Sequence, residues 1–106
     1  MDLARATPET FSPHLGSLFG VERPPEEVPS AGAAVELRLT DVAALPDQAG
    51  APRREPFALE FSGPREPLLE QRIYRLRHDV LGALEVFLVP IGYDDAGGVR
   101  YQSVFN

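Results

Sequence analysis

The last twenty residues, FLVPIGYDDAGGVRYQSVFN (87–106), decide how this chain folds. An apolar run leads into Asp-Asp-Ala-Gly-Gly, and a second run follows in which residues alternate in character. In that second run, one set of side chains is Val99, Tyr101, Ser103 and Phe105, and the other is Arg100, Gln102 and Val104. Alternation with a period of two is the mark of a strand with one face buried. The stretch therefore predicts two antiparallel strands joined by a short turn.

The Asp-Asp-Ala-Gly-Gly segment has two interpretations, a calcium site or a turn. Calcium takes 6–8 oxygen ligands, and its loops carry acidic residues at alternating positions. Here Asp94 and Asp95 are neighbours, and no acidic residue follows them. Aspartate bonds readily to its own backbone, and Gly97 or Gly98 can adopt positive φ, so both residue types suit a hairpin. We therefore expect a turn and no metal.

The strand before this turn, residues 83–92, is apolar on both faces. Leu84, Val86 and Leu88 alternate with Phe87, Val89 and Ile91. Such a strand is central or has a second layer over its outer face. Either the N-terminal segment and the loops cover that second face, or another subunit does. If another subunit does, the interface candidates are Phe87, Val89, Ile91 and Val104, with Arg75 and Arg77 beside them.

Four earlier segments also read as short strands, and a helix-start signal precedes them. Thr7, Pro8 and Glu9 suit a helix N-terminus, and Pro13 and Gly16 keep that helical segment short. The strands fall in 17–22, 33–45, 56–63 and 71–79, with alternation such as Val35, Leu37, Leu39 and Tyr74, Leu76, His78. With no long amphipathic helix, the chain is expected to be all-β. The prediction is one domain over residues 1–106: a small antiparallel barrel or sandwich of about six strands with a short N-terminal helical segment.

Composition limits the classes of partner. The chain has 106 residues, a net charge of −6 and no cysteine. An acidic protein is a poor ligand for nucleic acid or for anionic membranes. No apolar run approaches the ~20 residues of a membrane helix, and the N-terminus lacks a signal-peptide core. We therefore expect no nucleic-acid partner, no membrane insertion, and a cytoplasmic protein at synthesis that would leave the cell only by a leaderless route.

Catalytic patterns are weak. His78 and Asp79 could belong to a relay, yet neighbours in a strand point to opposite faces. No serine lies in G-x-S-x-G, neither phosphate-binding glycine motif occurs, and the second histidine, His14, gives at best half a metal site. The sequence predicts a structural His78, no enzyme activity and no cofactor.

Four arginines gather within thirteen positions: Arg65, Arg72, Arg75 and Arg77. Arg75 and Arg77 share one strand face, which could bind phosphates, acidic sugars or a partner's carboxylates. The alternative is a solvated face, without aromatic neighbours, balanced by the acidic residues Glu66, Glu70, Asp79 and Glu85.

The chain carries a series of short motifs: Pro56-Phe57, Gly63-Pro64, Leu69 with Gln71, Tyr74 with Leu76 and His78, Leu81-Gly82, Phe87 to Gly92, and Tyr101 to Asn106. With the opening TFSPHLGSLF, these motifs resemble a small bacterial all-β domain family of unknown function. The resemblance covers nearly the whole chain, and Arg23 to Pro29 is its variable part. The resemblance implies no catalytic residues, and its recurring positions are turn glycines, strand prolines and buried aromatics. Its members sit near genes for phage-tail-collar or tail-fibre-like proteins, which implies an accessory role in assembly.

Two functions follow as expectations. The first is a non-enzymatic structural or accessory protein that acts through protein–protein contacts, with itself or with a fibre or tail-like protein, in a fibre, phage-tail-like or secreted assembly. The second is a small β-barrel that binds an anionic small molecule or sugar, with Arg75, Arg77 and Tyr74 near its pocket.

Overall fold

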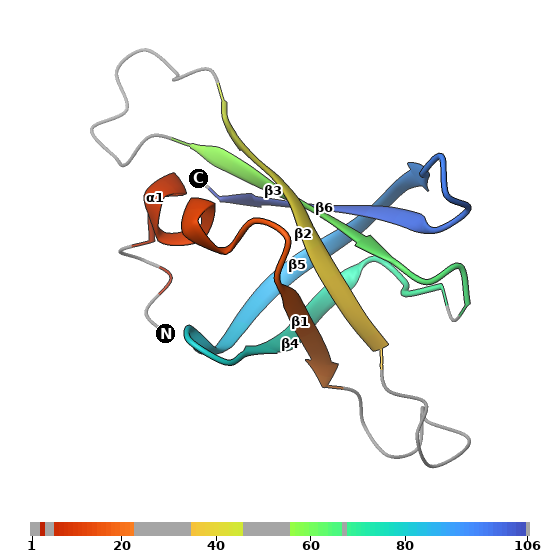
Figure 1. The fold of residues 1–106 in the computed structure, drawn as a ribbon, viewed down its shortest axis with the longest axis horizontal. Coiled ribbons are helices and arrows are strands. Elements are labelled where there is room, and N and C mark those ends of the chain that lie inside the picture. The colour runs from red at the N-terminus through yellow and green to blue at the C-terminus, as the bar shows by residue number, and fades with distance from the viewer. Residues whose placement is uncertain (1–2, 4–5, 23–34, 46–55, 67, 106) are drawn as a thin grey trace.

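The protein is a closed six-stranded antiparallel barrel with a short helical segment at its N-terminus (Figure 1). The structure is a computed structural model, and it describes residues 3, 6–22, 35–45, 56–66 and 68–105. The elements are α1 (Pro8–Phe11), the 3-10 helix η2 (Ser12–His14), β1 (Leu18–Glu22), β2 (Val35–Ala44), β3 (Phe57–Gly63), β4 (Arg72–His78), β5 (Gly82–Tyr93) and β6 (Val99–Phe105). The all-β prediction is confirmed, and of its two architectures the barrel is the one formed.

The strands follow the order β1-β2-β3-β6-β5-β4 around the wall, and β4 closes the ring by pairing with β1. The last three strands form an antiparallel meander, with β5 between β4 and β6. Closure leaves none of these six strands with a free edge, so strand addition by a partner is not available to the barrel.

Alternation along each strand fills the barrel interior. The inward residues are mostly large and apolar, and the most deeply buried include Phe19, Leu37, Leu39, Phe57, Leu59, Phe61, Leu76, Leu88 and Tyr101. Tyr101 also satisfies its hydroxyl, which accepts a hydrogen bond from the Leu69 amide at 2.9 Å. At roughly 25 cal/mol per Å² of buried apolar surface, this interior is the main source of stability.

The N-terminal segment closes one end of the barrel. Phe11 of α1 is fully buried, and its ring lies 6.0 Å from that of Phe57 and 5.7 Å from that of Phe105. Phe57 and Phe105 stack on each other at 4.8 Å. The segment therefore packs on the end of the barrel and not on the outer face of β5. The loops that were the other candidates for that cover, 23–34 and 46–55, lie outside the described residues.

Among the described residues, none of the helices has the length and apolar character that crossing a bilayer requires.

Candidate functional site

Four apolar side chains on β4, β5 and β6 point away from the core, and we call them the outer patch: Ile73, Phe87, Ile91 and Val104. Their exposed fractions are 64%, 46%, 39% and 45% respectively. Ile73 and Phe87 stand directly opposite each other across β4 and β5. β5 lies between β4 and β6, so the patch spans three adjacent strands (Figure 1). Val89, also predicted for this face, is half-buried and pairs with Gln102 of β6.

The inner face of the same strand is fully enclosed. Leu84, Val86 and Leu88 are buried, as the alternation predicted. A β-bulge follows, where the register with β6 shifts between Pro90 and Gly92. Bulges bend and twist a strand locally, and Ile91 lies at this one. Single exposed apolar residues are ordinary, but adjacent ones on neighbouring strands form a surface that contact with another molecule would bury.

Arg75 and Arg77 lie on the outer face of β4, and each forms an ion pair with Glu22. The Glu22 carboxylate is 3.0 Å from Nε of Arg75 and 3.1 Å from Nε of Arg77. Of the acidic residues predicted to balance this face, Glu85 stands opposite Arg75 across β4 and β5. The contact with Glu22 could not be predicted from the sequence, because only barrel closure brings β1 beside β4.

The four clustered arginines do not form one face. The Arg65 guanidinium lies 4.7 Å from the centre of the Tyr93 ring, and that of Arg72 lies 4.8 Å from the Tyr74 ring. These two arginines therefore make cation–π contacts, and they do not belong to the face that Arg75 and Arg77 share.

Tyr74 faces inward, is buried, and donates its hydroxyl to the Glu70 carbonyl at 2.8 Å. Arg75 and Arg77 face outward from the same strand. One pocket cannot be lined by all three, because the strand itself separates them.

His78, at the end of β4, is buried against the N-terminal segment. Its Nδ1 accepts hydrogen bonds from the Val80 amide at 3.0 Å and the Leu81 amide at 3.1 Å, and Nε2 lies 3.0 Å from the Ser17 hydroxyl. Because Nδ1 is an acceptor, the neutral ring carries its proton on Nε2 and donates it to Ser17. The geometry thus gives His78 no free nitrogen with which to activate Ser17 as a nucleophile. Sequence reasoning missed the Ser17 contact, for which the serine's local sequence carries no signal.

The Asp-Asp-Ala-Gly-Gly segment forms the predicted turn between β5 and β6. Asp94 Oδ1 accepts hydrogen bonds from the Ala96 amide at 2.9 Å and the Gly98 amide at 2.7 Å, while Oδ2 accepts one from the Ser62 hydroxyl at 2.6 Å. Gly97 has φ of 89°, and a Cβ on Gly98 would lie 2.5 Å from the Gly63 carbonyl oxygen. The hydrogen bond from Ser62, followed by that from Gly98, lowers the pKa of Asp94 below its usual value. Within the described part of the chain, no group of three or more acidic or histidine side chains is placed to hold a metal ion.

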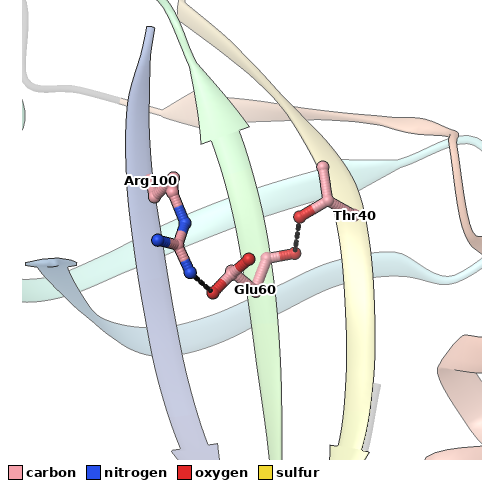
Figure 2. A network of polar contacts seen from close by, with 3 residues as sticks. All are labelled: Thr40, Glu60 and Arg100. Atoms are coloured by element: carbon pink, nitrogen blue, oxygen red, sulfur yellow. Dashed lines mark hydrogen bonds and ion pairs between the residues drawn. The ribbon is translucent and has the colours of Figure 1, made fainter. Parts of the chain in front are cut away.

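A polar network lies on the outer surface of β2, β3 and β6 (Figure 2). Arg100 of β6 donates to Glu60 of β3 at 2.6 Å, and Thr40 of β2 donates to the Glu60 carbonyl at 3.1 Å. The hydrogen bond to Glu60, then the charge of Glu60, raises the pKa of Arg100. Beside this network lies an open hollow of about 330 Å³, which Asp94, Asp95 and Tyr93 also line. Among its charged groups, Glu60 and Arg100 pair with each other, and Asp94 is bonded to Ser62 and to its own turn.

A comparison with protein-family models finds one domain over residues 6–105, described as a domain of unknown function, DUF6916. The chain belongs to the DUF6916 family. The match spans the whole barrel and its N-terminal segment, in agreement with the resemblance to a family of unknown function. Comparisons of this DUF6916 chain with curated proteins and with solved structures find no match.

Proposed function

We propose that this protein is a non-enzymatic structural or accessory subunit that works by protein–protein contact through its outer patch. The observation that carries the proposal is the pairing of Ile73 with Phe87, two exposed apolar side chains opposite each other on adjacent strands. Aromatic residues are enriched at protein interfaces, where their large apolar area is buried.

The closed barrel sets how a partner binds. With the strand edges paired around the ring, a partner docks on side chains of the wall and does not extend the sheet. The partner is a second copy of this chain or a fibre or tail-like protein, and the setting we propose is a fibre, phage-tail-like or secreted assembly. That setting rests on the resemblance to the family's motifs. The net charge of −6 makes nucleic acid an unfavourable partner.

Light scattering on the purified chain tests self-association through the patch. The double variant Ile73→Ser/Phe87→Ser removes the paired apolar side chains, and Thr40→Ser on β2 is a matched control on the polar side of the wall. We expect the wild type and the control to exceed the monomer mass of 11.6 kDa as concentration rises, and the double variant to stay at that mass. Equal masses for all three at every concentration would exclude the patch as a self-association surface.

The second candidate, a barrel that binds an anionic small molecule or sugar, has less support. The barrel interior is occupied by large side chains, and Arg75 and Arg77 point outward into ion pairs with Glu22. A hollow of about 690 Å³ near His14, Arg38 and Arg77 is the surface that this alternative would use, and it is open to solvent. Calorimetric titration with sulfate and with a uronic acid measures anion binding to the protein directly. The absence of any heat of binding at millimolar concentrations would exclude this candidate function.

A further inference from the structure

His78 connects two parts of the chain that are distant in sequence. Its ring, in a residue only 8% exposed, lies 4.5 Å from the Phe19 ring of β1 and 4.7 Å from the ring of His14 in η2. On one side it bonds to the turn between β4 and β5, through Val80 and Leu81. On the other side it bonds to Ser17, which follows η2.

The two hydrogen bonds that Nδ1 accepts from the turn require the neutral ring. Nδ1 accepts two amide hydrogens, so it cannot carry a proton without losing both. Nε2 donates to the Ser17 hydroxyl, whose own hydrogen goes to the His14 carbonyl oxygen at 2.5 Å. A proton added at Nδ1 would point at two N–H donors, and a ring that turns away to avoid them would lose its contact with Ser17.

The charged groups around the ring of His78 shift its pKa in opposite directions. Burial, followed by the neighbouring His14, lowers the pKa of His78, and Asp79 of the turn acts the other way. Arg77 of β4 and Arg38 of β2 line the same hollow, together with Glu36 of β2. Phe19, the side chain of β1 against the ring, carries no charge.

We propose that His78 is a proton-sensitive strap that holds the N-terminal segment Pro13–Ser17 to the turn between β4 and β5 when neutral and releases both when protonated. This inference is independent of the outer patch. It gives the barrel a device by which one end loosens in mildly acidic surroundings while the rest of the wall stays closed.

The sign of the pH effect follows from the direction of the pKa change. A folded state in which His78 has a lowered pKa binds fewer protons than the unfolded chain. The contribution of His78 to the free energy of unfolding is therefore fully present above the ordinary histidine pKa of about 6.5. It is lost as the pH drops from there through the lowered pKa. The Asp94 turn provides a contrast, because its acceptor is a carboxylate that stays ionised over this whole range.

Amide hydrogen exchange followed by NMR tests the proposal on the wild-type chain. Between pH 7.5 and pH 5, we expect protection of the Val80 and Leu81 amides, corrected for intrinsic exchange, to fall about tenfold, the order expected when two backbone hydrogen bonds are lost. The Ala96 and Gly98 amides, held by Asp94, should keep their protection. Equal changes at both turns, or no change at either, would overturn the proposal.

Two variants separate the strap from a general loss of stability. In His78→Asn the amide oxygen can accept the same turn amides but does not titrate, so the acid response of the turn should disappear even if overall stability drops. Burial is the larger cause of the lowered pKa of His78, and His14→Gln removes the second cause, the charge of His14, so the response should move to higher pH. An acid response that persists in His78→Asn, or a wild-type imidazole whose nitrogen shifts show the neutral proton on Nδ1, would contradict the proposal.

Discussion

The outer wall of this barrel has two sides that differ in how their side chains are satisfied. On β2, β3 and β6, Thr40, Glu60 and Arg100 bond to one another (Figure 2). On β4 and β5, Ile73 and Phe87 stand opposite each other with their apolar surface open. The polar side needs no further molecule, whereas the apolar side gains free energy if one covers it. We therefore expect a partner to bind at the apolar side, where Ile73 and Phe87 lie.

The largest loss of stability is expected from a substitution in the barrel interior, at Leu88, which is the next residue after Phe87 of the outer patch. Leu88→Ala empties a fully buried position on the inner face of β5 and should cost about 2–5 kcal/mol of unfolding free energy. Urea denaturation measures this loss. A cost below ~1 kcal/mol would mean that the two faces of β5 are not as different as the burial indicates.

Asp94→Ala should give the next largest effect. The substitution removes the acceptor of three hydrogen bonds that hold the turn and Ser62 together. We expect a lower melting temperature at pH 7, though less reduced than in Leu88→Ala.

The pH dependence of the same residue gives a second readout. Because the folded-state pKa of Asp94 is lowered, its contribution is present above the ordinary aspartate pKa of about 3.9 and is lost as the pH falls below it through the lowered value. The melting temperatures of wild type and Asp94→Ala should therefore converge at acidic pH. A difference that stays constant from pH 7 to pH 2 would contradict this role.

Phe87→Ser should separate folding from association. Its side chain is half exposed, so the free energy of unfolding should change by about 1 kcal/mol or less. Self-association measured by light scattering should nevertheless weaken markedly. A large loss of stability with unchanged association would place Phe87 in the core and not in an interface.

The smallest effect is expected on the polar side. Glu60→Gln keeps the shape of the side chain and removes one charge of a half-buried pair with Arg100. Ion pairs that solvent still reaches contribute little to stability, so the melting temperature should fall only slightly. A drop as large as that of Leu88→Ala would show that this side carries more of the fold than its exposure indicates.

Alternation along the chain predicted the strands and the face of each residue, because a period of two needs no knowledge of neighbours. The two-sided pattern of residues 84–91 correctly placed Leu88 inside and Phe87 outside. Turn chemistry predicted the role of Asp94, since aspartate and glycine bond locally.

Contacts between distant segments could not be predicted in this way. The pairing of β1 with β4, which brings Glu22 to Arg75, depends on barrel closure. The approach of Ser17 to His78 depends on the path of the N-terminal segment, and the sequence marks neither contact. The bulge at Ile91 was also missed. In a strand that is apolar on both faces, one inserted residue does not interrupt the run of apolar side chains.

Site-specific photo-crosslinking tests the central claim most directly. A photoreactive phenylalanine analogue is placed at Phe87 in the outer patch, and at Thr40 on the polar side as the control, in the cell that produces the protein. We expect a discrete protein adduct from position 87 and none from position 40, and the mass of the adduct will show whether the partner is a second copy of the chain. Absence of any protein adduct at position 87, or equal adducts at both positions, would contradict it.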